Sequence, residues 1–338
     1  MIRLRLSLLI SILLPLAGGF SFSAWGAESA PSFDLPVSCT LGESCWIQNH
    51  VDHDPGPNAI DYHQGSLTYD GHRGTDFRVK TFREMRAGVP VIAAADGKVK
   101  AVRDGMADGP ASGTIDKSAI GERLSGNGVV IDHGQGWESQ YGHLRQGSVI
   151  VKPGQKVRAG ERLGWIGQSG MAQFPHVHFE IRRNGQFVDP FSPPDPEKKS
   201  ASPLWSSQAW EHLKAYRASG ELSSGFSDTP PDIAWVADPP DLTLDASAKA
   251  LIFWVNIFGA RTDDRENMRL IAPSGTVLAK QSRTYTKNQA RSMRFLGKPR
   301  PKDRDSWPSG RYTGEYTLER EGASAAPLVR IIRTLDIP

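Results

Sequence analysis

The chain has 338 residues, which is enough for two folded domains and connecting segments, and its formal net charge at pH 7 is only +3. No stretch is dense enough in lysine and arginine to follow a phosphate backbone, so we expect no nucleic-acid partner. The whole sequence contains only two cysteines, so a zinc site built on their thiolates would need further ligands nearby.

Residues 1–26 have the pattern of a secretory signal peptide. Arg3 and Arg5 precede an apolar run that ends in small residues, and Ala24-Trp25-Gly26 forms an acceptable cleavage signal. The alternative is an uncleaved membrane anchor, because the apolar run approaches the length of a short transmembrane helix. We expect cleavage, which lowers the net charge from +3 to +1, and no later apolar run predicts a stable membrane span.

Residues 27–60 form an N-terminal segment that carries both cysteines. Cys39 and Cys45 lie close together in SCTLGESCW, and an oxidising compartment lets such a pair form a small structural disulfide. The alternative is a redox or metal site, but C-x-x-C spacing is absent and a metal would need further ligands nearby. We therefore predict a disulfide between Cys39 and Cys45.

Residues 61–193 have the pattern of a β-rich domain. Short runs that alternate like strands are broken by turn signals, and helical periodicity is scarce. Asp96-Gly97 stands between two apolar runs in VPVIAAADGKVKAV and predicts a hairpin. Residues 104–127 are rich in glycine and polar residues and predict a long surface loop. This loop either restricts access to a site or decorates the surface, and we favour decoration.

The composition changes after Phe191, where proline, serine and charged residues replace the alternation. Residues 194–232 are therefore interpreted as a linker, with a short helix expected at residues 208–218. Residues 233–338 contain strand-like runs separated by turn residues and predict a smaller, β-sandwich-like accessory domain. The predicted fold class is all-β: a compact, mostly antiparallel β-sheet domain followed by this smaller domain.

Four of the nine histidines lie in contexts that suggest a site. They are His72 in YDGHRGTDF, His143 in SQYGHLRQ, and His176 and His178 in FPHVHFEIR. Asp76 follows His72 by four residues, an even spacing that places both side chains on one face of extended structure. Tyr141 is predicted to share a face with His143 by the same argument. Of the other histidines, His133 is interpreted as structural, because it stands at a turn after a strand. The remaining four have no convergent partners in the sequence: His50, His53, His63 and His212.

The stretch FPHVHFEIR separates into two faces of one strand. Val177, Phe179 and Ile181 are expected to pack into the core, which leaves the two histidines on the opposite face. Neutral imidazoles and one carboxylate suit zinc, and a catalytic zinc site takes three protein ligands and leaves the fourth position for water. Each of these motifs alone has a simpler explanation, such as a polar face of a strand, so the interpretation as a zinc site depends on their combination.

Four segments follow one another in the order found in the LytM/lysostaphin-type zinc metallopeptidases. They are GHRGTDF, VVIDHGQGWESQYGHL, VKPGQKVRAGERLGWIGQSG and PHVHFEIRRNGQFVDP, and the resemblance covers about residues 61–193. It implies a mostly antiparallel β fold with one Zn²⁺ at the floor of a groove. It further implies His72, Asp76 and His178 as metal ligands, and His143 and His176 as catalytic residues that do not bind the metal.

The resemblance also implies an activity. The chain resembles periplasmic, zinc-dependent metalloendopeptidases that hydrolyse the peptide cross-links of bacterial peptidoglycan. No H-E-x-x-H glutamate is present, so an imidazole must act as the general base. His176 is the first choice and His143 would stabilise the oxyanion, although the two roles are exchangeable. Tyr141 either orients His143 or packs in the core.

A second functional class is compatible with the same sequence. In this alternative the chain is a catalytically restrained or non-enzymatic envelope binding or activator protein, which keeps the fold and recruits an envelope protein partner through its C-terminal domain. That domain resembles no family we can name. Its most apolar stretch, LIFWVNIF, places Phe253, Trp254 and Phe258 most simply in the core.

The resemblance is weakest just before the P-H-x-H motif. Relatives commonly have S-T-G there, whereas this chain has MAQFP, with Met171, Gln173 and Phe174. Because this loop borders the groove in the family, the resemblance implies the metal site but leaves the substrate preference open.

Overall fold

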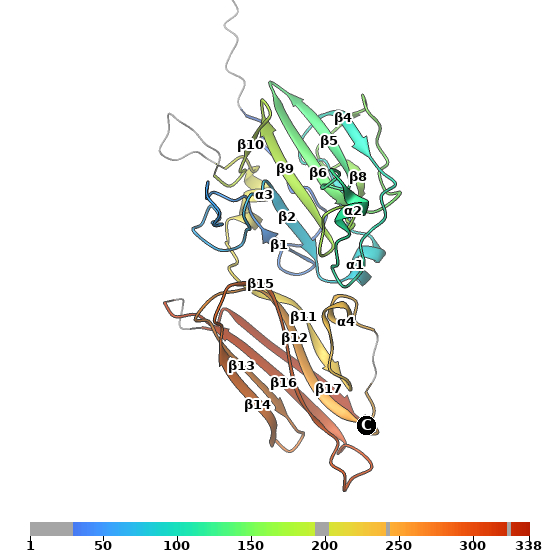
Figure 1. The fold of residues 1–338 in the computed structure, drawn as a ribbon, viewed down its shortest axis with the longest axis vertical. Helices are drawn as coiled ribbons and strands as arrows, with labels where there is room; N and C mark the ends of the chain where they lie inside the picture. Colours follow the sequence, from blue (N-terminus) through green and yellow to red (C-terminus); the bar gives the residue numbers. More distant parts are fainter. Residues whose placement is uncertain (1–29, 193–202, 241–243, 323–325) are drawn as a thin grey trace, which may run out of the picture. The chain divides into compact units, whose positions relative to one another are not determined.

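The computed structural model describes residues 30–192, 203–240, 244–322 and 326–338 (Figure 1). The predicted signal peptide, residues 1–26, lies outside the described residues. Among the described residues, no helix is both long enough and apolar enough to cross a membrane.

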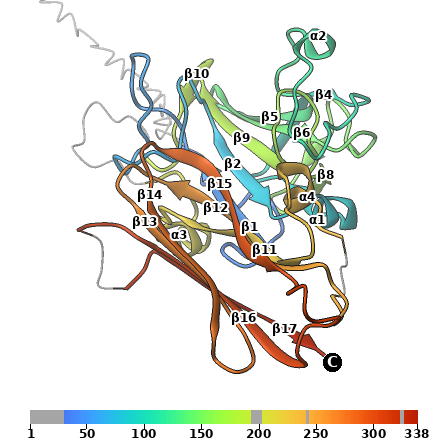
Figure 2. The ribbon, with the colours of Figure 1, turned by 60° about the horizontal axis from the view of Figure 1, so that its bottom comes forward.

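The first domain is built on one large antiparallel sheet. Its strands follow the order β1-β2-β9-β6-β5-β4-β7, and β10 pairs with the C-terminal part of β9, on the edge that β2 occupies at the other end of the strand. The strands are β1 (Cys45–Asn49), β2 (Thr75–Val79), β4 (Gly97–Arg103), β5 (Asn127–Gly134), β6 (Trp137–Leu144), β7 (Lys156–Val157), β9 (His176–Arg183) and β10 (Gln186–Val188). Figures 1 and 2 show β9 between β2 and β6. Strand β9 is therefore the central support for the residues on its neighbours.

Smaller elements complete this domain. Strands β3 (Pro90–Ile92) and β8 (Arg162–Trp165) form a separate two-stranded sheet. The helices are short: α1 (Phe82–Ala87), α2 (Lys117–Ile120) and α3 (Ser207–Leu213). Helix α1 begins with a capping box, in which Thr81 and Glu84 satisfy each other's backbone N–H groups.

Strand β9 has the two faces that its alternation predicts. Val177, Phe179 and Ile181 are fully buried in the hydrophobic core of the sheet. His176 and His178 project from the opposite face, where His176 is buried and His178 is partly exposed. The core side of β9 thus fixes the positions of the two histidines.

The predicted hairpin at Asp96-Gly97 is wrong. Strand β3, before this turn, pairs with β8, whereas β4, after it, pairs with β5 and β7. The Asp96 carboxylate accepts a hydrogen bond from the backbone N–H of Ala159 at 2.8 Å. The turn therefore passes the chain from one sheet to the other, a long-range arrangement that the local turn signal does not contain.

Two observed strands lie outside the limits expected for the domains. Strand β1 stands before residue 61 but pairs with β2, and its first residue, Cys45, forms the predicted disulfide with Cys39. Strand β11 (Gly220–Ser227) lies in the expected linker but pairs with β12. Its sequence, GELSSGFS, is rich in glycine and serine, which have low strand propensity. Pairing with a strongly apolar neighbour outweighs that propensity.

The second domain has two antiparallel sheets that share a core. One has the order β11-β12-β15 and the other the order β14-β13-β16-β17 (Figure 2). Its remaining elements are α4 (Ile233–Ala237), β12 (Ala250–Ala260), β13 (Arg265–Ile271), β14 (Val277–Thr284), β15 (Gln289–Pro299), β16 (Gly310–Glu319) and β17 (Val329–Ile337). Phe253, Trp254 and Phe258 are all buried, but only Phe253 lies in the predicted sandwich core. Phe258 belongs to a separate small apolar cluster, and the ring of Trp254 contacts that of Trp235. This arrangement is a β-sandwich.

Candidate metal centre and active site

One acidic and one basic side chain face each other across β2 and β9. The register of the two strands pairs Asp76 with His178, and Asp76 Oδ1 lies 2.9 Å from His178 Nδ1. His72, on the loop before β2, places its Nε2 3.2 Å from each of these two atoms. One ligand atom from each residue lies within 4.8 Å of the others, so the three can hold a metal ion.

The orientation of His72 is fixed from behind. Its Nδ1 lies 2.6 Å from the backbone carbonyl oxygen of His50. A carbonyl only accepts hydrogen bonds, so Nδ1 carries the proton and Nε2 presents its lone pair to the centre. Such a partner on the far nitrogen is the usual way in which proteins orient a metal-binding histidine.

His178 faces the centre through its other ring nitrogen. Its Nδ1 points to Asp76, while its Nε2 lies 3.7 Å from Glu180 Oε2. Glu180 in turn accepts a hydrogen bond from Arg182. Burial opposes protonation of His178, but the carboxylates of Asp76 and Glu180 outweigh it and raise its pKa to about 9. A cation at this centre therefore competes with a proton for Nδ1.

Glycine at position 74 makes room for the His178 ring. A Cβ atom at Gly74 would lie 2.7 Å from His178 Nε2 and 2.6 Å from the Phe179 carbonyl oxygen. These separations are too short for any side chain. The second glycine in GHRGTDF, Gly74, is thus required by the close approach of β9.

His143 and His176 lie beside the three converging residues. Their ring centroids are 4.6 Å apart, and His176 Nε2 lies 3.5 Å from Asp76 Oδ1. His143 Nδ1 lies 2.7 Å from the Ser169 carbonyl oxygen, and His176 Nδ1 lies 2.8 Å from that of Phe174. Both rings therefore donate through Nδ1 and, when neutral, present an unprotonated Nε2.

The shared face predicted for Tyr141 and His143 is wrong. Tyr141 is opposite Phe179 and packs in the core, where its hydroxyl bonds to the N–H of Ala94. His143 has a positive φ of 61°, which breaks the alternation of β6 and turns its ring toward His176. Tyr141 therefore packs, and the Ser169 carbonyl orients His143.

The electrostatics of the site favour an ionised Asp76 beside two neutral rings, those of His143 and His176. Burial opposes ionisation of Asp76, but His72, His176 and His178 outweigh it and hold its pKa well below the usual value. Burial, with the neighbouring His176 and His178, lowers the pKa of His143 well below its usual value. Burial also lowers the pKa of His176, although Asp76 opposes this. Both rings are therefore neutral near pH 7.

Phe174 supports His176 in addition to bordering the site. Its ring centroid lies 4.5 Å from that of His176, and the guanidinium of the buried Arg78 lies 4.5 Å from the same phenyl ring. Because the Phe174 carbonyl also accepts from His176, this residue restrains the imidazole twice. Its aromatic side chain is thus part of the support for the site.

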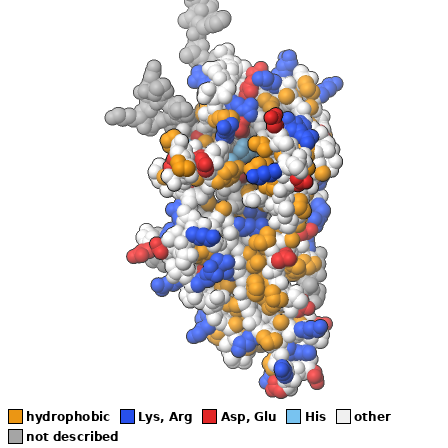
Figure 3. Space-filling view, in the orientation of Figure 1, with side chains coloured by type: hydrophobic (Ala, Val, Ile, Leu, Met, Phe, Trp, Pro, Cys, Tyr) orange, Lys and Arg blue, Asp and Glu red, His pale blue; other side chains and the backbone are white. Residues whose placement is uncertain are grey.

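Apolar side chains are exposed next to the histidines. Tyr69 is 54% exposed and its ring lies 4.5 Å from that of His72. Leu124 and Met171, also exposed, are joined by a backbone hydrogen bond near the residues that contact His143. In Figure 3 the histidine colour reaches the surface among hydrophobic and basic side chains. This surface can contact a ligand with apolar groups.

The predicted surface loop reaches the site at its C-terminal end. Its Ser125 carbonyl accepts the backbone N–H of His143, and Asp108 accepts the N–H of Gln168. Residues 104–127 also contain the short helix α2. The loop is therefore tied to the segment that orients His143.

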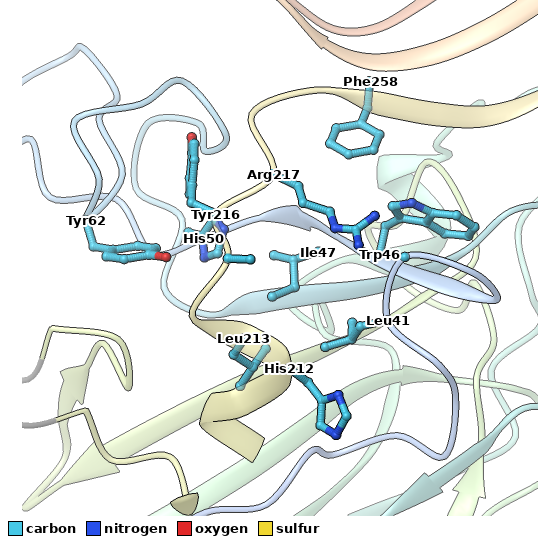
Figure 4. Close-up of a pocket in the computed structure, with 12 residues that line it drawn as sticks. Leu41, Trp46, Ile47, His50, Tyr62, His212, Leu213, Tyr216, Arg217 and Phe258 are labelled. Carbon is cyan, nitrogen blue, oxygen red and sulfur yellow. The ribbon is translucent and has the colours of Figure 1, made fainter. Parts of the chain in front are cut away.

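A separate cavity lies near the support of His72 (Figure 4). It is lined by six residues between Leu41 and Tyr62, five between His212 and Arg217, and Phe258, and its volume is about 30 Å³. His50, Tyr62 and Tyr216 line it, and none of the five site residues does. Its size suits one or two water molecules. It is too small for a peptide segment.

Comparison with known families identifies the first domain. The sequence model of peptidase family M23 matches residues 70–190. This segment is an M23 peptidase domain. All five predicted site residues fall within it, and three of them are the group able to hold a metal. The M23 domain has the predicted fold, a mostly antiparallel β-sheet, and the resemblance inferred from the motifs is confirmed.

Related proteins resemble the M23 domain and not the whole chain. The chain is 34% identical over 118 residues to the peptidoglycan DD-endopeptidase ShyA of Vibrio cholerae, covering 35% of this chain and 22% of that protein. It is 38% identical over 110 residues to the murein hydrolase activator EnvC of Escherichia coli, covering 32% of this chain and 23% of that protein. The chain thus spans about a quarter or less of the length of these relatives.

A solved structure also resembles the domain. It is that of a zinc containing peptidase from Vibrio cholerae, with 26% sequence identity and a TM-score of 0.32. The match covers 47% of this chain and 39% of that one.

The sequence did not predict the groups that hold the site in place. The carbonyls of His50, Ser169 and Phe174 orient three imidazoles, and backbone acceptors have no signature in residue type. Glu180 lies on the same strand face as His178, so the period-two argument contained this neighbour. Asn49, on the neighbouring strand β1, also contacts Asp76, and no local sequence pattern indicated this contact.

Proposed function

We propose that the chain is a zinc-dependent metalloendopeptidase that hydrolyses peptide cross-links of bacterial peptidoglycan. The observation that carries the proposal is the arrangement of two kinds of residue. His72, Asp76 and His178 converge on one point, and His143 and His176 stand beside it with Nε2 unprotonated. In this account the first three hold one Zn²⁺ per chain and the other two act on protons.

The three converging side chains fit zinc. Two imidazoles and one carboxylate are typical zinc donors, and a fourth position is left for water, as in catalytic sites. Both cysteines are in a disulfide and cannot compete as ligands. Zinc bound there would lower the pKa of a water ligand to about 7 and polarise the scissile carbonyl.

His176 is the proposed general base. Its Nε2 lies 3.5 Å from Asp76 Oδ1, beside the three converging side chains. A neutral ring whose Nδ1–H is held by the Phe174 carbonyl accepts a proton at Nε2 and later passes it to the leaving amine.

His143 is proposed to stabilise the oxyanion, which sets a condition on its protonation. With Nδ1–H donated to Ser169, the ring donates through Nε2 only when it carries a second proton. Burial lowers the pKa of His143, so the resting ring is a proton acceptor. His143 must therefore take a second proton from the solvent before it can donate, because the proton of the attacking water goes to His176, and an exchange of roles between the two histidines is tested below.

The substrate and the location are inferred from relatives. ShyA is named a peptidoglycan DD-endopeptidase, and the predicted signal peptide and the disulfide agree with a periplasmic protein. The exposed Tyr69, Leu124 and Met171 offer apolar contacts to a peptide stem. The C-terminal sandwich is a candidate site for an envelope protein partner.

The alternative is a non-enzymatic activator. EnvC, named a murein hydrolase activator, shares 38% identity with this chain over the matched residues. This chain, however, keeps both the metal-binding group and the two neighbouring histidines with their Nε2 atoms turned to the site. An activator needs no such proton-accepting pair, which favours the enzyme.

Digestion of purified sacculi tests the proposal. The mature protein is freed of metal with a chelator and then supplied with one equivalent of Zn²⁺, and the muropeptides are separated after complete glycan digestion. We expect cross-linked muropeptides to decrease only after zinc is restored. Unchanged cross-links with zinc bound would favour the activator.

A further inference from the structure

Strand β1 is irregular at the point where it meets Asp76. The ladder with β2 pairs Trp46 with Arg78 and Ile47 with Phe77, but the next pair is Asn49 with Asp76. Gln48 is therefore the extra residue of a β-bulge. A regular ladder would have placed Gln48 opposite Asp76. The bulge replaces it with Asn49.

Asn49 contacts the carboxylate directly. Its Nδ2 donates to Asp76 Oδ2 at 2.8 Å, and both side chains are buried, with exposed fractions of 5% and 2%. The carboxylate accepts only, so the amide must present its NH₂ group to it. Gln48 points elsewhere, because its Oε1 accepts from Arg78 at 2.8 Å.

The two oxygens of Asp76 therefore have different surroundings. Oδ1 faces the ring nitrogens of the site: it lies 2.9 Å from His178 Nδ1, 3.2 Å from His72 Nε2 and 3.5 Å from His176 Nε2. Oδ2 is turned away and is occupied by Asn49. Without the amide, the carboxylate would be free to rotate about its terminal torsion, which is a soft one.

We propose that Asn49 is a positioning residue of the metal centre. It holds Oδ2 and turns Oδ1 toward the ring nitrogens of His178 and His72, so that Asp76 would offer a metal ion one oxygen. The inference depends on the metal centre of the proposed function. It adds a contributor from the N-terminal segment, before the residues that the family model matches. Outer partners of this kind typically change metal affinity 10- to 100-fold.

The test compares three variants of the full mature protein. Asn49→Leu keeps most of the side-chain volume and removes the donor, and Asn49→Ala removes the donor with a smaller side chain in case leucine does not fit. Gln48→Ala is the matched control, because it alters the neighbouring bulge residue and leaves Asp76 untouched. Zn²⁺ affinity is measured by competition with a chromophoric chelator, and the stability of the metal-free proteins by urea unfolding.

We expect Asn49→Leu and Asn49→Ala to bind Zn²⁺ roughly 10- to 100-fold more weakly, and Gln48→Ala to stay within about threefold of the wild type. The visible bands of Co²⁺-loaded Asn49→Leu should also shift, because the coordination geometry changes. If both Asn49 variants lose stability without metal but keep the wild-type Zn²⁺ affinity and Co²⁺ spectrum, the role is structural and the inference is overturned. A wild type that binds no Zn²⁺ would instead overturn the proposed function.

Discussion

Asp76 and His178 are directly opposite each other in the ladder between β2 and β9, and their facing atoms are 2.9 Å apart. Backbone hydrogen bonds of the sheet thus set the separation of two of the three converging side chains. His72 comes from a loop, but its ring is anchored on the His50 carbonyl. The site is therefore preorganised on rigid elements, which a metal centre requires.

Removal of any one of the three converging side chains should abolish metal binding. We expect His72→Ala, Asp76→Ala and His178→Ala to contain less than a tenth of the zinc of the wild type, measured by elemental analysis after dialysis. His143→Ala is the control and should keep one zinc per chain, since its Nδ1 is held by Ser169. Zinc loss from His143→Ala as complete as from the other variants would refute the proposed ligand set.

Gly74→Ala tests the close approach of the His178 ring. The added Cβ would lie 2.7 Å from His178 Nε2 and 2.6 Å from a backbone oxygen, so the ring or the strand must move. A shift of this size should weaken Zn²⁺ binding at least tenfold in chelator competition. Gly56→Ala is the control, because the nearest atom is an oxygen of the Asp54 side chain. Wild-type affinity in Gly74→Ala would show that the site tolerates a wider spacing.

The roles of the two catalytic histidines can be separated by glutamine. Glutamine donates a hydrogen bond but cannot take a proton. If His143 stabilises the oxyanion, His143→Ala should lose about 10²–10³ in kcat, and His143→Gln should recover part of it. His176→Gln should recover nothing, because the general base must accept a proton. The opposite pattern of recovery would exchange the two roles.

The regular strands made much of this site predictable. In β9 the alternation is unbroken, so the burial of Val177 and Phe179 and the opposite placement of His176 and His178 follow from the period of two. The even spacing of His72 and Asp76 likewise indicated convergence. These inferences needed only local geometry and the ligand preferences of zinc.

The features that the sequence did not predict depend either on backbone geometry that departs from a regular strand or on pairing between distant segments. The positive φ of His143 turns its ring away from the face that alternation assigns to it. The bulge at Gln48 brings Asn49 to Asp76, and no residue pattern marks a bulge of this kind. The residues that pair with β4 lie between 25 and 60 positions further along the chain. Pairing between segments so far apart in the chain leaves no local pattern in the sequence.

Buried His50 predicts a pH dependence of stability. Burial lowers its pKa from 6.5 to about 4, although Asp189 and Asp61 oppose the shift. Below pH 6.5 the unfolded chain therefore binds a proton at this residue that the folded chain does not, so stability falls as the pH drops from 6.5 to about 4. The contribution is roughly 3 kcal/mol over that interval.

The variant His50→Phe removes this group and leaves the carbonyl that holds His72. Urea unfolding of the metal-free protein at pH 7 and pH 4.5 should show a loss of stability that is smaller by roughly 2 kcal/mol or more in the variant than in the wild type. His212→Gln, which changes an exposed histidine, should lose as much as the wild type. Equal losses in His50→Phe and the wild type would contradict the assignment.

The most direct test of the central claim uses one defined substrate. A soluble, peptide-cross-linked muropeptide dimer is incubated in ¹⁸O-labelled water with zinc-reconstituted protein, with metal-free protein, and with zinc-supplemented His178→Ala. We predict that only the first sample converts the dimer to monomers, with one ¹⁸O atom in the newly formed carboxylate as read by mass spectrometry. An intact dimer in the first sample, with one zinc bound per chain, would contradict the account.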